Sequence, residues 1–524
     1  MVPQPASSRQ PVSRRRVLGL AAASAASLAL LAACGSPTAG SGAATPAPAS
    51  SSAAATSAAA TTAAATTAAP AATSVAASSV AATTASSATS AAVQSASAVS
   101  SSASPAASTA SVQSAGVTLK IAVAEGGQSQ AVQWDPIWAA WQQLHPEFKT
   151  TVNSFTGLSV DQYREKLITL LAGGETFDNL YFHHVISGEF MGHGLLRPID
   201  SYIAQNASAV NTSDYSPYLL KIFGWEGKQY GLPQEANPWA TWYNSDLLAR
   251  SGLQKPEELI QSNKWDWTTG FLDLAKSATH KGSDAQTWGY GGWGNGQGYW
   301  GWTYWLPPVW SNGGDLWTSD FKHLALDQDP AIEALQFWAD LSTKYDVAPP
   351  QDQGKQWDQT AGQIAMGSFA PFTVPNFDKF HWKPGMVVNP SGPAAGAFYA
   401  SGTSAFGIST LSKNPDPAWQ WCQWICTDGV KIWLDHGFFT APPRKSLATY
   451  PGWVSSRKPW ESVDTWAKAT AAIRLPAAVP GWTDAINALS KELNLALLGK
   501  QTAKDAIAKV KAPIDAILQQ AVAP

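Results

Sequence analysis

The feature that most constrains this 524-residue chain is the uneven distribution of its charged and aromatic residues. No charged residue occurs between Arg16 and Lys120, and no Phe, Trp or Tyr precedes Trp134, so all 26 tryptophans lie at or beyond that position. The part beyond residue 116 can bury a large core and is long enough for two domains or lobes. The part before it lacks the apolar and aromatic side chains that a core requires.

Residues 1–33 have the pattern of an export signal. Three arginines at 14–16 precede an uncharged apolar stretch at 17–33, which is short for a membrane-spanning helix. The order Ser-Arg-Arg-x-Val-Leu resembles a bacterial twin-arginine signal, and 31–35 resembles a lipobox. The resemblance implies a lipid on Cys34 that holds the chain, as a lipoprotein, on the outer face of the cell membrane. The alternative is a chance arginine cluster beside a short membrane anchor.

Residues 34–116 consist almost entirely of Ala, Ser and Thr after the cysteine. With no aromatic side chains, few aliphatic ones and no charge, burial cannot offset the loss of chain entropy. Ser and Thr interrupt the Ala runs, and no apolar stripe is present that would dock a helix. We therefore expect a disordered tether, open to glycosylation, with a random-coil reach of about 50 Å.

The charges and cysteines exclude some classes of protein. The chain has 34 Lys and Arg against 37 Asp and Glu, a formal net charge of −3, which argues against a nucleic-acid-binding protein. Cys422 and Cys426 stand four residues apart in a Trp-rich helical pattern. Because a disulfide between residues four apart on a helix is strained, we expect two buried free thiols. A disulfide remains an alternative, since exported proteins meet an oxidising environment.

Beyond residue 116 the pattern alternates between strands and helices. Residues 117–123 alternate apolar and polar positions, and a helix with Trp134, Ile137 and Trp141 on one face follows. A strand at 148–155, a second helix ending at Gly173-Gly174 and a third strand at 178–182 continue the alternation. This order predicts an α/β fold with a largely parallel sheet and helices on both faces. Ligands of such sheets bind beyond the carboxyl ends of the strands.

Eight short stretches, in this order, resemble the extracellular solute-binding proteins of ABC sugar importers, of the maltose-binding-protein type. Each stretch alone is weak, and their common order makes the resemblance specific. They are 192–200 (Gly-His-Gly-Leu-Leu-Arg-Pro-Ile-Asp), 230–233 (Tyr-Gly-Leu-Pro), 242–248 (Trp-Tyr-Asn-Ser-Asp-Leu-Leu), 265–267 (Trp-Asp-Trp) before a helix at 271–278, 330–341, 365–367 (Ala-Met-Gly), 414–419 (Asn-Pro-Asp-Pro-Ala-Trp) and 442–446 (Pro-Pro-Arg-Lys-Ser).

The resemblance implies a two-lobed periplasmic-binding-protein-like fold with a hinge between the lobes. Placed on this pattern, lobe 1 comprises 117–233 plus 395–447, and lobe 2 comprises 234–394 plus 448–524. The chain would cross between them near 232–237, 399–404 and 442–443. The resemblance also implies a monomer without enzymatic activity or cofactor, which binds a mono- or oligosaccharide and delivers it to the transmembrane subunits of an ABC permease.

The Trp- and Gly-rich segment 288–310 is the most informative chemical feature. A sugar ring presents a face of C–H groups and a rim of hydroxyls, which a flat indole and a few fixed polar groups complement. By the resemblance, aromatic residues of this segment face the ligand. The alternative is that several of them pack in the core. The candidates are Trp302, Tyr304 and Trp305, followed by Trp293 and Trp300.

Further ligand-binding candidates follow the predicted strands, and each could instead serve in capping, strand termination or the core. At Asn237 similar proteins often have a carboxylate, so this departure leaves the polarity of the site open. The candidates are Glu125 and Gln128 after the first strand, Phe182 and His183 after the third, Asn237 and Trp239 at the first crossing, Phe369 after 365–367, and Gly402 and Thr403 at the second crossing.

Catalytic and metal-binding patterns are weak. A G-x-G-x-x-G run at 289–294 lacks a preceding apolar strand, and no G-x-S-x-G elbow occurs. His183, His184 and His193 lack the spacing of a zinc site. We therefore predict no catalytic and no metal-ligating residue. Two alternatives stay open: a surface glycoside hydrolase, whose carboxylate pair would have no local motif, and a wall-associated polymer-binding lipoprotein.

Overall fold

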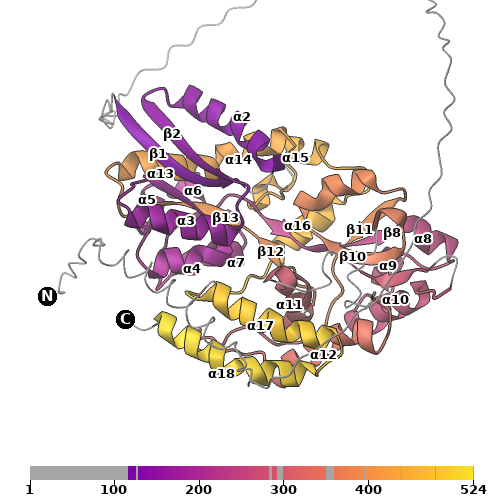
Figure 1. The fold of residues 1–524 in the computed structure, drawn as a ribbon. Coiled ribbons are helices and arrows are strands. Elements are labelled where there is room, and N and C mark those ends of the chain that lie inside the picture. Colours follow the sequence, from indigo (N-terminus) through magenta and orange to yellow (C-terminus); the bar gives the residue numbers. More distant parts are fainter. Residues whose placement is uncertain are drawn as a thin grey trace, which may run out of the picture. The chain divides into compact units, whose positions relative to one another are not determined.

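The computed structural model describes residues 116–125, 128–282, 286–291, 299–349, 359–394, 396–437, 440–477 and 479–522. These residues fall within one compact unit, in which two larger β-sheets lie apart from one another (Figure 1). Helices and strands are mixed throughout, as the α/β prediction requires. In the described part of the chain, no helix combines the length and the apolar character needed to cross a bilayer.

The first sheet has the strand order β2-β1-β3-β13-β6. Its strands are β1 (Val117–Glu125), β2 (Phe148–Thr156), β3 (Asn179–His183), β6 (Leu232–Pro233) and β13 (Ser404–Ile408). β1 pairs in parallel with β2 and β3, which confirms the three predicted strands, whereas β13 runs antiparallel to β3 and β6. The sheet is therefore mixed, because a distant segment returns to it.

Helices cover both faces of this sheet. Apolar side chains of α2 and α13 pack on one face, and those of α3 and α4 pack on the other. Ser159 caps α3 by accepting a hydrogen bond from the backbone N–H of Gln162. The helices around the sheet are α2 (Gln128–Leu144), α3 (Val160–Ala172), α4 (His184–Gly192), α5 (Asp200–Gln205), α6 (Ala207–Val210), α7 (Pro217–Lys221), α13 (Pro415–Cys426) and α14 (Asp428–Asp435).

The α13 helix carries two cysteines toward the first sheet. Cys422 and Cys426 are both buried and free, which confirms the prediction from their spacing. Asn179 of β3 donates a hydrogen bond to Cys422 Sγ at 3.1 Å. Burial raises the pKa of both thiols well above the usual value, so neither forms a reactive thiolate near neutral pH.

The second sheet has the order β11-β8-β10-β9. Its strands are β8 (Ala240–Asn244), β9 (Trp288–Tyr290), β10 (Ile364–Phe369) and β11 (Pro384–Val387). Helices α12, α17 and α18 pack side by side below it in Figure 1. The helices of this region are α8 (Ser245–Arg250), α9 (Pro256–Gln261), the π-helix η2 (Trp267–Phe271), α10 (Leu272–Ala278), η4 (Tyr299–Gly301), α11 (Trp302–Ser311), α12 (Asp329–Thr343), η5 (Gln359–Ala361), η6 (Pro371–Lys379), α15 (Pro451–Ser455), α16 (Val463–Ala471), α17 (Trp482–Leu497) and α18 (Ala503–Val522).

Three chain segments lie side by side where the polypeptide passes between the two sheets. The strand β7 (Asn237–Pro238) pairs antiparallel with β12 (Ser401–Gly402), which directly precedes β13. Ala236 and Ala441 exchange two backbone hydrogen bonds of 3.0 and 2.8 Å. β7 and β12 lie at the first two crossings that the resemblance implies, and Ala441 lies next to the third. The crossings and the lobe boundaries stay predictions. The remaining short elements are η1 (Thr212–Asp214), β4 (Gly224–Trp225), β5 (Lys228–Gln229) and η7 (Lys445–Leu447).

Candidate functional site

Several predicted residues meet at the carboxyl end of β3, beside the crossing segments. Gly402 pairs with Asn237, and a Cβ atom placed on Gly402 would lie 3.6 Å from His183 Nε2 and 3.7 Å from Asn237 Cβ. Glu125 ends the neighbouring parallel strand β1, and Gln128 begins α2; the side chains of both lie outside the described part of the structure. This edge of the sheet is where ligands of α/β proteins bind.

A carboxylate missed by the sequence analysis completes this group. Glu235 accepts a hydrogen bond from Asn237 Nδ2 at 3.2 Å and another from Ser404 Oγ. Gln234 Nε2 donates to the same Ser404 hydroxyl, and Thr403 Oγ1 donates to the Glu235 carbonyl at 2.7 Å. Glu235 thus places a carboxylate two residues before Asn237, the position at which similar proteins often have one. Its position in the predicted first crossing was the signal that could have identified it.

We call Glu235, Asn237, His183, Gly402 and Ser404 the polar cluster. Burial raises the pKa of Glu235, and the hydrogen bonds from Ser404 and Asn237 oppose this shift. Burial lowers the pKa of His183 to about 3, so the imidazole is neutral near neutral pH. The cluster therefore combines one carboxylate with uncharged amide, hydroxyl and imidazole groups.

Two side chains of the cluster have unused hydrogen-bonding capacity. Asn237 is only 8% exposed, and its Oδ1 has no hydrogen-bond partner among the described residues. The same holds for His183 Nδ1 and, on the adjoining residue, for His184 Nε2. The other ring nitrogen of His184 lies 3.3 Å from the backbone nitrogen of Thr403, whose side chain is fully buried. Buried polar atoms in native proteins are almost always paired, with protein groups or with ordered water, so these atoms add unused hydrogen-bonding capacity to the cluster; core indole nitrogens such as that of Trp302 also lack a partner among the described residues.

Two exposed aromatic rings lie near the polar cluster. Trp300 is 42% exposed, and its ring stands edge-on to His183 with 5.7 Å between the ring centroids. Trp239, two residues beyond Asn237, contacts Tyr304 and Phe372 at 5.3 and 5.9 Å. Phe372 is 49% exposed. The polar cluster is thus accompanied by flat apolar surfaces on both the η4 and the η6 side.

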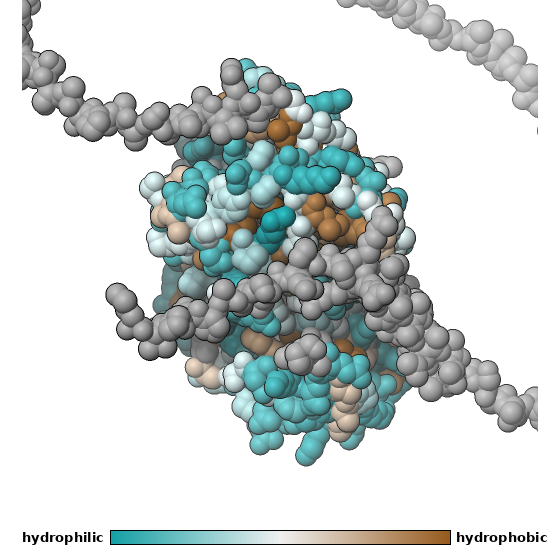
Figure 2. Space-filling view, turned by 90° about the vertical axis from the view of Figure 1, so that its left-hand side faces the viewer, coloured by the Kyte–Doolittle hydropathy of each residue, from teal (hydrophilic) through white to brown (hydrophobic). Residues whose placement is uncertain are grey.

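Large exposed apolar side chains are otherwise scattered over the described surface. On the face shown in Figure 2, hydrophilic residues surround smaller apolar patches. The remaining large exposed hydrophobic residues are Leu144, Tyr218, Ile260 and Val454. Exposed Trp300 and Phe372 stand out because each contacts, directly or through Trp239, the region of the polar cluster.

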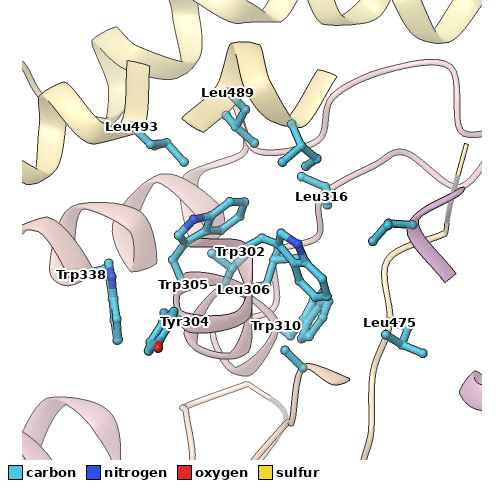
Figure 3. Close-up of a cluster of buried hydrophobic side chains, with 14 of the residues drawn as sticks. Trp302, Tyr304, Trp305, Leu306, Trp310, Leu316, Trp338, Leu475, Leu489 and Leu493 are labelled. Carbon is cyan, nitrogen blue, oxygen red and sulfur yellow. The ribbon is translucent and has the colours of Figure 1, made fainter. Parts of the chain in front are cut away.

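The foremost predicted sugar contacts lie in the hydrophobic core instead. Trp302, Tyr304 and Trp305 are 0%, 5% and 2% exposed, and they project from α11 into a dense apolar cluster (Figure 3). Trp302 packs edge-on against His184 at 5.7 Å, and Tyr304 packs against Trp239. These two buried rings therefore contact residues that adjoin the polar cluster. The apolar neighbours labelled with them in Figure 3 are Leu306, Trp310, Leu316, Trp338, Leu475, Leu489 and Leu493.

The physical reason is that α11 has no exposed face. Every residue from Trp302 to Ser311 is buried, so sequence periodicity offers no polar side by which to orient the helix. The exposed indole is Trp300, in the preceding turn η4. Trp293 lies outside the described residues.

Phe182 is also a core residue. It is fully buried on β3 and packs against Phe190 and Phe223, with ring centroids 6.2 and 5.1 Å apart. Because successive side chains of a strand point to opposite faces, the neighbouring His183 is directed away from this core. Of the predicted Phe-His pair, only the histidine reaches the polar cluster.

Phe369 is buried as well, at the end of β10. Its ring packs against Phe377 and Trp466 at 5.4 and 5.1 Å. The exposed aromatic residue near this strand end is Phe372, which follows Pro371 at the start of η6. The proline breaks the strand pattern and was the available signal that the next aromatic residue leaves the buried face.

Comparisons with known proteins agree with this architecture. A family model described as bacterial extracellular solute-binding protein matches residues 125–432. A binding protein of Brucella abortus is 23% identical, covering 77% of this chain and 93% of its own length. A cyclic alpha-maltosyl-1,6-maltose binding protein of Arthrobacter globiformis has a similar structure (TM-score 0.65, 19% identity, 77% of this chain and 99% of that one).

The sugar-binding protein MalE of Xanthomonas citri is also similar, with a TM-score of 0.64, 17% identity and coverage of 77% of this chain and 98% of that one. At these identities the structural likeness concerns the fold. Together with the two separate sheets, it confirms the predicted two-lobed architecture.

Proposed function

Since the chain belongs to the family of bacterial extracellular solute-binding proteins, we propose that it captures a carbohydrate between its two lobes and delivers it, chemically unchanged, to the transmembrane subunits of an ABC importer. The observation that carries the proposal is the pairing of exposed Trp300 with the unpartnered polar atoms of His183 and Asn237. An indole face complements the C–H face of a sugar, and the polar atoms complement its hydroxyls.

Both predicted lobes contribute to this arrangement. His183 and Gly402 belong to predicted lobe 1, and Trp300 to predicted lobe 2. A second contact joins the same regions: Thr483 Oγ1 of α17 donates to Asp161 Oδ1 of α3 at 2.8 Å. A ligand that touches both lobes stabilises the arrangement in which they are in contact, to the extent of its differential affinity for that arrangement.

The proposal includes the route to the membrane. The twin-arginine pattern at 14–18 and the lipobox around Cys34 support export and lipidation, and the composition of 34–116 supports a tether that holds the binding lobes away from the lipid. We propose that the chain works as a monomer on the outer face of the cell membrane.

A melting-temperature screen of the purified full chain against neutral mono- and oligosaccharides tests the proposal. A ligand of the native state raises the melting temperature, so at least one saccharide is expected to do so with one-to-one stoichiometry. The saccharide should be recovered intact after incubation. Release of shorter products would favour the glycoside hydrolase, and a shift produced only by a betaine, a peptide or a metal ion would contradict the substrate class.

A further inference from the structure

We infer that the polar cluster selects against negatively charged ligands, and that Glu235 is the residue that determines this selectivity. The inference rests on the proposed function and narrows its substrate class. The ligand would be a saccharide that presents hydroxyl or amino groups to the polar cluster, and not carboxylate, sulfate or phosphate groups.

The first argument is the isolation of the carboxylate from positive charge. Both oxygens of Glu235 accept hydrogen bonds from neutral groups, Ser404 Oγ and Asn237 Nδ2. No ion pair joins Glu235 to a lysine or an arginine in the described part of the chain. Arg164, on the neighbouring α3, is already paired with Glu189 at 2.7 Å. The negative charge of Glu235 therefore remains available to act on a ligand.

The imidazoles of the site supply no compensating charge. His183 is partly buried and His184 is buried, and their ring centroids lie 4.2 Å apart. Burial holds the pKa of both rings below the usual value. An anionic group placed among Glu235, His183 and Asn237 would therefore meet a like charge and no counter-charge.

The second argument is the type of hydrogen-bonding group left open. Asn237 is more than nine-tenths buried, one of the two N–H groups of its Nδ2 donates to Glu235, and its free Oδ1 is an acceptor. Glu235 also offers only acceptor atoms when it is ionised. A hydroxyl or an ammonium group can donate to both residues, whereas a carboxylate or a phosphate has no donor for Asn237 Oδ1 or Glu235 and leaves Asn237 Oδ1 unpaired.

The test compares one saccharide in two charge states. The neutral oligosaccharide that binds best in the melting screen is titrated calorimetrically into the full chain, beside the same oligosaccharide with its C6 hydroxymethyl groups oxidised to carboxylates. For a ligand carboxylate about 6 Å from Glu235 in a medium of effective dielectric constant about 20, the repulsion corresponds to roughly a hundredfold weaker binding. Equal or tighter binding of the oxidised form would overturn the inference.

The substitution Glu235→Gln tests whether Glu235 causes the weaker binding of the oxidised saccharide. It keeps the size of the side chain and removes the charge, so the ratio of the two dissociation constants should shrink at least tenfold. Glu165→Gln, an equal charge change at an exposed position of α3, should leave the ratio as in the unmodified chain. An unchanged ratio in folded Glu235→Gln would also overturn the inference.

Two outcomes separate this inference from the proposed function. If no saccharide binds, neutral or oxidised, the proposed function fails and the inference fails with it. If the oxidised saccharide binds well, only the inference fails. Should Glu235→Gln not fold, the unmodified chain is titrated at falling pH with the neutral saccharide and with its O-sulfated form, whose sulfate stays ionised. Protonation of Glu235 should bring these two dissociation constants closer together, and constants that stay apart would overturn the assignment to Glu235.

Discussion

At the scale of single residues, the candidate site combines one carboxylate, uncharged polar groups and one exposed indole. Glu235 and Asn237 provide acceptors, His183 provides an uncharged ring, and Trp300 provides a flat apolar face. His183 ends a strand of the first sheet, Asn237 lies in β7, and Trp300 lies in the turn η4. The substitutions that change binding should therefore differ from those that change stability.

Trp300→Ala should weaken saccharide binding by about 1–2 kcal/mol, roughly tenfold in Kd, because the stacking surface is lost. Its effect on the free energy of unfolding should be small, since 42% of the side chain is already exposed. Trp305→Ala, a matched change in the buried part of the same segment, should instead destabilise the fold by about 3–5 kcal/mol. Calorimetric titration and chemical denaturation separate the two. Equal losses of affinity in both variants would contradict the assignment.

Saccharide affinity should decrease as the pH falls through the pKa of Glu235, which lies above the ordinary value of 4.5. Hydroxyl donors favour the ionised carboxylate, so binding lowers this pKa and is strongest above it. The other titratable groups facing Glu235 do not compete: burial keeps Tyr181 neutral and the pKa of His183 at about 3. Titrations between pH 4 and pH 8 should show the decrease, and Glu235→Gln should abolish it.

The unliganded chain should respond to pH in the opposite sense. A carboxyl whose pKa is raised on folding binds its proton more tightly in the native state. The free energy of unfolding attributable to Glu235 therefore decreases as the pH rises above about 4.5 and through the pKa of the folded state. Glu235→Gln should remove this contribution as well. A pH dependence of unfolding identical to that of the unmodified chain would show that Glu235 is not buried as described.

At the scale of elements, the sequence predicts those helices and strands whose apolar residues lie on one face only. The alternation in β1 and the one-sided stripe of α2 identify a strand and a helix, and the structure confirms both. The sequence shows where α11 lies in the chain, but it does not show which of its side chains face the ligand, because all of them are buried. Phe182 and Phe369 were misplaced for a related reason: an aromatic residue at a strand end fits either face, and only tertiary packing decides between them.

The packing of α13 against the first sheet makes a further prediction. Cys422 and Cys426 are buried, and burial raises the pKa of each thiol. In the native chain neither should react with a thiol reagent such as DTNB, and both should react once denaturant exposes the helix. A chain with Cys34→Ser isolates the two thiols for counting. Rapid reaction of either thiol without denaturant would mean that α13 detaches from the sheet in the native state.

At the scale of the whole molecule, α3 and α17 make a contact between the predicted lobes that lies outside the polar cluster. Thr483→Ala removes the hydrogen bond to Asp161 without altering a residue of the cluster. If this contact favours the ligand-bound arrangement, its loss should weaken saccharide binding by about 1 kcal/mol, roughly fivefold. Thr169→Ala, which removes a hydrogen bond within α3 only, should leave the affinity unchanged. Small-angle scattering should show a larger radius of gyration for free Thr483→Ala than for the Thr169→Ala control.

The three adjacent crossing segments also restrict how the molecule can move. β7 is joined edge to edge with β12 on one segment, and Ala236 with Ala441 on another. Backbone hydrogen bonds therefore join three short segments that lie side by side. We expect motion between the two predicted lobes to be a rotation about one axis through these segments, because the segments stay joined while the regions on either side move.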